Sequence, residues 1–77
     1  MINVERDIVD VVVENINRYL KEKNMNQKYL EDEIGSKSIQ NLLRKETKHG
    51  CGIRTLQRIA LALEVKTIDL VEDWSEE

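Results

Sequence analysis

The sequence predicts an all-α fold of five helices in one domain, residues 1–77. Three observations lead to this prediction. Apolar residues recur three and four positions apart over most of the chain, and no segment alternates with the two-residue period of a strand. The composition is that of a globular domain, with 40% hydrophobic and 35% charged residues. Without Phe, the single small core must be mostly aliphatic.

The first expected helix is extended. It runs from near the N-terminus to about Lys23, where Asn24 caps it. Val9 and Val13 widen its apolar face beyond what one small core needs, so either a second chain or the last helix is expected to cover them. The apolar positions that define this helix are Ile2, Val4, Ile8, Val11, Val12, Ile16, Tyr19 and Leu20.

The second and third helices are expected on either side of a glycine. Asn26 is a good N-cap for a helix over residues 27–34, and Gly35 ends that helix in a left-handed conformation. Ser36 then caps a third helix over residues 37–45. The inward-facing positions are Leu30 and Ile34, then Ile39, Leu42 and Leu43.

Two more helices complete the predicted fold. A loop over residues 47–52 precedes a helix over residues 53–63, and a short last helix covers residues 67 to about 74. Their apolar positions are Leu56, Ile59, Ala60 and Leu63, then Ile68, Leu70 and Val71.

The net charge of −3 conceals a basic middle segment. Residues 36–66 hold seven basic and two acidic side chains. Residues 1–35 hold five basic and eight acidic ones, and residues 67–77 hold five acidic ones and no basic one. A basic segment between acidic flanks is typical of a localised phosphate-binding face. Accidental clustering on a solvated helix surface would give the same pattern.

Several classes of protein are not expected. The single cysteine, Cys51, excludes an internal disulfide and fits a reducing cytoplasm. No apolar stretch approaches the ~20 residues of a membrane span. His49 lies two positions from Cys51, but a metal site needs three or four ligands and the chain has no further His or Cys. We therefore expect a cytoplasmic protein that is not an enzyme, with no cofactor, metal or small-molecule ligand and no contact with a membrane.

The two short helices around Gly35 form a helix-turn-helix unit over about residues 26–45. The first helix braces the second, whose exposed face and N-terminal end can enter the major groove of DNA. Gln and Asn side chains can pair with adenine, and Arg or Lys with guanine. The residues expected to contact bases or the groove are Ser36, Lys37, Ser38, Gln40, Asn41 and Arg44.

Two motifs carry a resemblance to a known family. Residues 27–35 have the spacing Gln-x-x-Leu-x-x-x-Leu-Gly, with Ile34 at the second Leu position. Residues 55–65 read Thr-Leu-x-x-Ile-Ala-x-Ala-Leu-x-Val, and Asp69-Leu70 follows. With these motifs, residues 13–71 resemble the Cro and lambda-repressor type of helix-turn-helix, the Xre-like family. The resemblance implies a five-helix, lambda-repressor-like DNA-binding domain, with DNA phosphate contacts expected from Gln27, Lys28, Lys45, Lys48 and Arg54.

Three features depart from the family's pattern. Ser36 follows Gly35 directly, which makes the turn about two residues short. Glu31 stands where relatives often have a small residue. Leu20 and Leu43 take the positions at which many relatives pair an Arg with a Glu, and we expect a Leu–Leu contact in place of that ion pair.

The expected function is sequence-specific binding of double-stranded DNA by a small transcriptional regulator of the phage or bacterial repressor type. A homodimer would place two recognition helices about one helical turn apart on the operator. The alternative is a protein-interaction module that keeps the fold without binding DNA, which Glu31, the short turn and the acidic ends favour. The expected dimer-interface residues are Val9, Val13, Val71 and Trp74.

Overall fold

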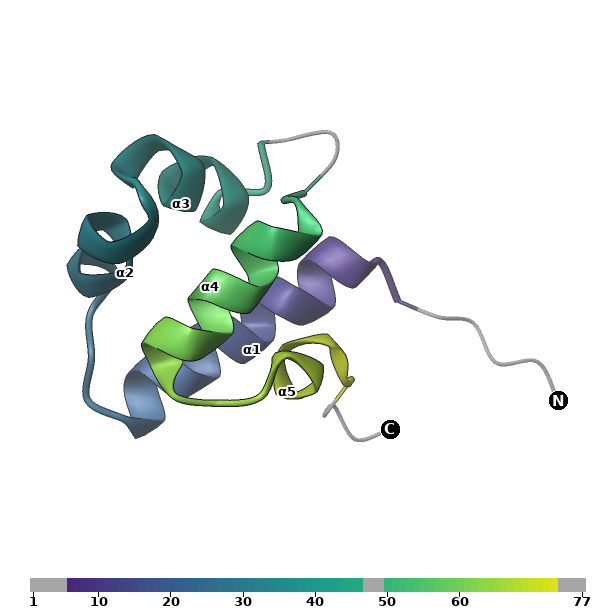
Figure 1. Ribbon diagram of the computed structural model, residues 1–77. Helices are drawn as coiled ribbons and strands as arrows, with labels where there is room; N and C mark the ends of the chain where they lie inside the picture. Colours follow the sequence, from purple (N-terminus) through teal and green to yellow (C-terminus); the bar gives the residue numbers. More distant parts are fainter. Residues whose placement is uncertain (1–5, 47–49, 74–77) are drawn as a thin grey trace, which may run out of the picture.

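Five helices and no strand are present among the residues that the computed structural model describes, 6–46 and 50–73 (Figure 1). Helix α1 spans Ile8–Glu22, α2 Gln27–Ile34, α3 Ser36–Leu43, α4 Ile53–Leu63 and α5 Thr67–Val71. In the view of Figure 1, α2 lies at the left, α3 lies at the upper left, α4 crosses in front of α1, and α5 lies below α4. The all-α prediction is confirmed, and α2 and α4 have the predicted bounds.

Helix α1 begins later than the apolar pattern suggested. The carboxylate of Asp7 accepts a hydrogen bond from the backbone N–H of Val9 at 2.8 Å, which makes Asp7 the N-cap. At the other end, Asn24 has a φ of 58° and follows the cap residue Lys23. The expected apolar positions Ile2 and Val4 lie outside the described residues.

The turn between α2 and α3 is a single residue, Gly35. Its N–H donates to the carbonyl of Glu31 and closes α2, and its carbonyl accepts the first helical bond of α3, from the N–H of Ile39. Gly35 has a φ of 138°, which an L-residue adopts only with strain. Because one glycine ends α2 and begins α3, Ser36 is already the first helical residue. The prediction that Ser36 caps α3 is therefore wrong. The predicted end of α3 near Lys45 is also wrong, because the helix ends at Leu43.

The core is aliphatic, as expected without Phe. Every helix contributes at least one side chain to a single buried cluster, which joins the helix-turn-helix unit to the other helices. Its members are Val12, Val13, Ile16, Leu20, Leu30, Ile39, Leu42, Ile59, Ala60, Leu63 and Leu70.

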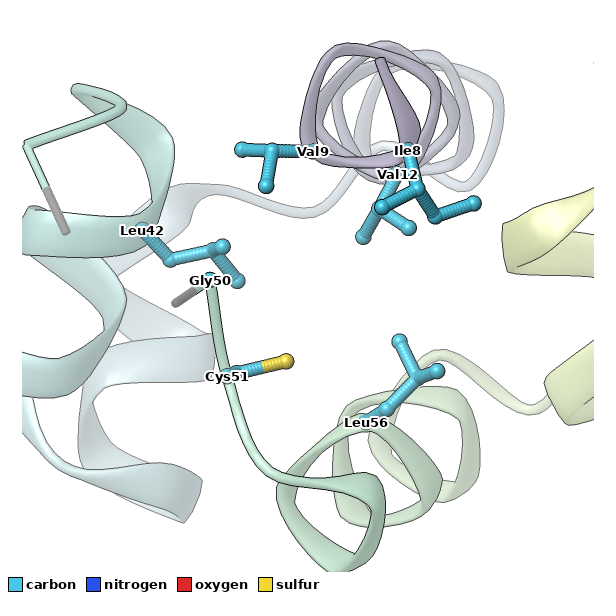
Figure 2. Close-up of a pocket in the computed structure, with 7 residues that line it drawn as sticks. All are labelled: Ile8, Val9, Val12, Leu42, Gly50, Cys51 and Leu56. Carbon is cyan, nitrogen blue, oxygen red and sulfur yellow. The ribbon is translucent and has the colours of Figure 1, made fainter. Parts of the chain in front are cut away.

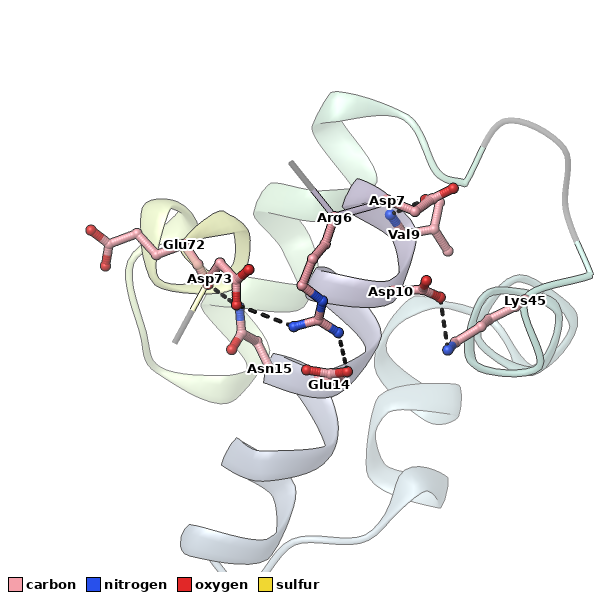
Figure 3. Close-up of polar contacts among 9 residues, drawn as sticks. All are labelled: Arg6, Asp7, Val9, Asp10, Glu14, Asn15, Lys45, Glu72 and Asp73. Atoms are coloured by element: carbon pink, nitrogen blue, oxygen red, sulfur yellow. Dashed lines mark hydrogen bonds and ion pairs between the residues drawn. The ribbon is translucent and has the colours of Figure 1, made fainter. Parts of the chain in front are cut away.

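Helix α5 is fastened to α1 by polar contacts (Figure 3). The side chain of Asn15 is 3% exposed, and its Nδ2 donates to the carbonyls of Leu70 and Glu72, each at 2.8 Å. Arg6 bridges Glu14 of α1 and Asp73 beyond α5. Because these bonds satisfy carbonyls at the end of α5, a helix of five residues can hold a fixed position on α1.

Candidate nucleic-acid interface

The two faces of α3 differ sharply. Ile39 and Leu42 are 0% and 2% exposed and fix the inner face against the core. The opposite face is polar. Its first turn is exposed, and its later positions are exposed or partly exposed; these residues are Ser36, Lys37, Ser38, Gln40, Asn41 and Arg44. All six residues predicted to contact bases or the groove are at least partly exposed. By helical spacing, Lys37, Gln40, Asn41 and Arg44 lie opposite Ile39 and Leu42, and the two serines lie on the flanks of that face.

The N-terminal end of α4 lies beside this surface. Ser38 and Asn41 of α3 line a shallow hollow together with Gly50, Cys51, Gly52 and Thr55. Gly52 is the N-cap of α4 and offers no side chain to bond the first amides of the helix. Free amides at a helix start carry partial positive charge and bind phosphate oxygens. Thr55 and Gly52 were not predicted as site residues, although the Gly-Cys-Gly run before α4 is a signal of an uncapped helix start.

The cations around this surface fall into two groups. Lys45 forms an ion pair with Asp10 at 2.8 Å, and Lys28 forms one with Asp32 at 3.1 Å. Gln27 is neutral, but its side chain is also paired, because its Nε2 donates a hydrogen bond to the carboxylate of Glu31 at 2.8 Å. In contrast, Lys37, Arg44 and Arg54 are exposed and make no ion pair with the rest of residues 6–46 and 50–73. Lys48, another predicted phosphate contact, lies outside the described residues, as does His49.

The Asp10–Lys45 pair joins α1 to the residues just after α3 (Figure 3). The hydrogen bond from Lys45 is the main cause that lowers the pKa of Asp10, and the charges of Lys45 and Arg6 add to it. Desolvation opposes the shift. Asp10 therefore stays ionised at neutral pH and keeps the Lys45 ammonium in an ion pair, although the Lys45 side chain is 47% exposed.

A small apolar cavity of about 90 Å³ lies beside the segment that leads into α4 (Figure 2). Figure 2 shows the thiol of Cys51 turned into this cavity, where burial raises the thiol pKa. Gly50 approaches α1 closely, since a Cβ there would lie 3.2 Å from Cγ2 of Val9. The close approach of Gly50 to Val9, and not the cavity itself, sets the segment before α4 beside α1. Its lining residues are Ile8, Val9, Val12, Leu42, Gly50, Cys51 and Leu56.

The predicted dimer-interface residues are largely used within one chain. Val13 is 4% exposed and belongs to the core, so it has little surface left for a second copy. Val9 and Val71 are partly buried and pack against the core. Trp74 lies outside the described residues.

A comparison with protein families decides the classification. A family model described as the Cro/C1-type HTH DNA-binding domain matches residues 15–74, most of the chain. The chain belongs to this family. The match contains the whole of α2, α3, α4 and α5, whereas residues 6–14, with Asp10, precede it. No curated protein and no solved structure matches the chain significantly.

Two further findings concern other classes of site. Among the described residues, no three His, Cys, Asp or Glu side chains are grouped so that they could hold a metal ion. In the same part of the chain, no helix is long and apolar enough to span a membrane.

Proposed function

We propose that this chain is a small transcriptional regulator of the phage or bacterial repressor type, which binds specific sequences of double-stranded DNA as a homodimer. It acts in the cytoplasm and carries out no chemical step of its own. The family match supports DNA as the partner. The other parts of the proposal follow from the small size of the chain and from the distribution of its polar and basic residues.

One observation carries the proposal. The outer face of α3 is polar, and it adjoins the uncapped N-terminal end of α4. Such a surface offers two kinds of contact side by side. Side chains of α3 can meet base edges in the major groove, and the amides of α4 can bind the phosphates that border the groove.

The roles divide by residue type. Asn41 and Gln40 can form paired hydrogen bonds with adenine, and Lys37 or Arg44 with guanine. Ser36 and Ser38 are short enough to contact a base or the sugar-phosphate edge. The phosphate contacts are assigned to Gln27 and Lys28 at the start of α2, to Lys45 and Lys48 after α3 in the sequence, and to Arg54 at the start of α4.

The test is fluorescence anisotropy with a labelled duplex of mixed sequence, over a series of salt concentrations. The wild type should bind weakly, in the range of about 10⁻⁴ to 10⁻⁶ M, and lose affinity steeply as salt rises. The double variant Lys37→Glu, Arg44→Glu should lose most of this binding, because it places two carboxylates on the outer face of α3.

A matched control changes the same amount of charge elsewhere. Lys23 is the C-cap residue of α1, and Lys66 lies between α4 and α5. Both residues are exposed, and both segments lie toward the bottom of Figure 1, away from α3. The double variant Lys23→Glu, Lys66→Glu should keep most of the affinity. If both double variants lose the same affinity for DNA, the loss reflects the change in net charge and not the position of Lys37 and Arg44. No binding of the wild type at low salt would remove DNA as the partner and favour a protein-interaction module. Selection of an operator from a random pool would follow a positive result.

A further inference from the structure

Arg58 is a cation of the basic middle segment to which no phosphate or base contact is assigned. It is exposed on α4, and its Nη2 donates a hydrogen bond to the backbone carbonyl of Glu33 in α2 at 3.1 Å. Glu33 is the last but one residue of α2, two positions before the one-residue turn at Gly35. The bond therefore joins α4 to the end of α2 that leads directly into α3.

The one-residue turn leaves the last carbonyls of α2 beyond its helical hydrogen bonds. Gly35 donates the last of these bonds, to the carbonyl of Glu31, so the carbonyls of residues 32–34 follow the end of the ladder. A longer turn can fold its own amides back onto such carbonyls, but the amides after Gly35 already belong to α3. The guanidinium of Arg58 supplies a donor to one of the three, the carbonyl of Glu33.

The charge of Arg58 acts in the same direction as its hydrogen bond. The C-terminal end of a helix is the negative end of its dipole, yet the last turn of α2 contains no basic residue. It holds three consecutive acids instead, Glu31, Asp32 and Glu33. A cation from α4 therefore offsets a charge distribution that α2 by itself leaves unfavourable.

The apolar anchoring of α2 is narrow, so a polar bond at its end matters for its direction. Leu30 is the only buried side chain of α2, and Ile34 is partly buried and packs against the core. Beside them a hollow opens between α2 and α4, with Glu33 and Arg58 in its lining. The packing of Leu30 fixes where α2 lies, and an attachment at the C-terminal end fixes the angle at which α2 meets α3.

We propose that Arg58 is a positioning residue of the DNA surface, which sets the orientation of α3 through α2 and does not contact a phosphate. Because one residue joins the two helices, a tilt of α2 is passed on to the side chains of α3. Hydrogen bonds to base edges depend on distance and angle, whereas the attraction to phosphates is far less directional. Loss of Arg58 should therefore weaken recognition of a specific sequence more than general attraction to DNA. This inference rests on DNA binding by α3, which is part of the proposed function.

The first experiment uses the free protein. Arg58→Met keeps an apolar stem in the hollow and removes the charge and the donors. NMR of the ¹³C,¹⁵N-labelled variant should show changed shifts at the carbonyl carbon of Glu33 and at the amides of residues 35–37. Arg58→Lys restores a charged donor and should return these shifts toward the wild-type values. Circular dichroism checks that each variant is folded.

The second experiment compares two duplexes, an operator that the wild type selects from a random pool and a duplex of mixed sequence. Arg58→Met should bind the operator roughly tenfold more weakly, about the effect of one mismatched base pair, and Arg58→Lys should recover most of this loss. On the mixed duplex, Arg58→Met should keep the wild-type slope of log K against log salt. Arg54→Met is the matched control, one turn earlier on α4, and should lower that slope by about 0.9 through loss of a phosphate contact.

The outcomes separate the two roles that Arg58 can have. A slope lowered by about 0.9 in Arg58→Met would make Arg58 a phosphate contact and overturn the proposal. Unchanged shifts at Glu33 and at residues 35–37 would also overturn it, because the bond to Glu33 would then not hold α2. If the wild type binds neither duplex, the proposed function fails, whereas the NMR comparison still decides whether Arg58 orients α2 and α3.

Discussion

The ammonium group of Lys45 lies 2.8 Å from the carboxylate of Asp10, so the first turn of α1 is tied to the segment that follows α3. Asp10 lies in residues 6–14, ahead of the segment that the family model matches. Asp10 therefore belongs to a part of α1 that the family model does not match, whereas Lys45 lies within the matched segment. Since Lys45 is a proposed phosphate contact, Asp10 competes with DNA for the same cation.

Removing that competition should strengthen binding. In Asp10→Asn, Lys45 is free to pair with a phosphate, so we expect tighter binding to a mixed-sequence duplex. The slope of log K against log salt should become steeper by about 0.9, the value for one more phosphate contact. Glu22→Gln is the control, because it breaks the Arg18–Glu22 pair at the other end of α1. If the two variants have equal slopes, Lys45 does not contact a phosphate.

The same pair predicts a pH effect of definite sign. Lys45 lowers the pKa of Asp10, so the pair stabilises the folded protein above the ordinary Asp value of about 3.9. This contribution is lost as the pH falls through the lowered pKa of Asp10. Carboxyl-detected NMR titration should show the pKa of Asp10 rising in Lys45→Gln. An unchanged midpoint in that variant would mean that the pair does not form in solution.

Gly35, the single glycine of the helix-turn-helix unit, should be hard to replace. Its φ of 138° lies outside the range of L-residues, and Gly35→Ala should cost on the order of 1–3 kcal/mol in the free energy of unfolding. Gly52 is the contrasting case, with a φ of −72° and no atom within 4 Å of an added Cβ. Gly52→Ser supplies the missing cap of α4 and should not destabilise the fold. Urea unfolding of both variants, followed by circular dichroism, measures the difference; similar losses would contradict it.

The expected Leu–Leu contact can be tested by truncation. Leu43 is only partly buried and packs at the edge of the core cluster that includes Leu20, which is 7% exposed. Leu43→Ala should therefore cost about 1–2 kcal/mol, less than a fully buried leucine would. Leu42→Ala is the reference, with 2% exposure and an expected cost of about 2–5 kcal/mol. If Leu43→Ala lowers the free energy of unfolding by less than about half a kcal/mol, Leu43 does not help to hold α3 in place.

The parts of the fold that local chemistry dictates were predictable from the sequence. The side chain of Asn26 accepts a hydrogen bond from the N–H of Tyr29. Asn26 is therefore the N-cap of α2, as its residue type predicted. The inner face of α3 followed from the spacing of Ile39 and Leu42. Gly35 was placed in the turn, but its double use as the end of α2 and the start of α3 was missed, since a serine next to a glycine is the stronger capping signal in sequence.

Contacts between distant segments could not be predicted in this way. Asp10 and Lys45 are far apart in the chain, and nothing in either neighbourhood indicates that they meet. The same holds for Asn15, whose hydrogen bonds to the end of α5 depend on how α5 packs. Lys45 was predicted to contact a phosphate because the sequence shows its charge but not its distant partner Asp10. The Lys28–Asp32 pair is different, since its two residues are four positions apart on a predicted helix and could have been anticipated. The sequence thus predicted which types of residue form the candidate site. Which of its lysines and arginines form ion pairs within the chain became clear only from the structure.

The central claim is that α3 and the start of α4 form the DNA surface, and an NMR titration tests it most directly. Uniformly ¹⁵N-labelled protein would be titrated at low salt with a mixed-sequence duplex, and the shift of every backbone amide would be followed. We predict the largest shifts over residues 36–41 and 52–55, with the amides of α5 nearly unchanged. Shifts confined to α1 or α5, or the absence of any shift, would contradict the account.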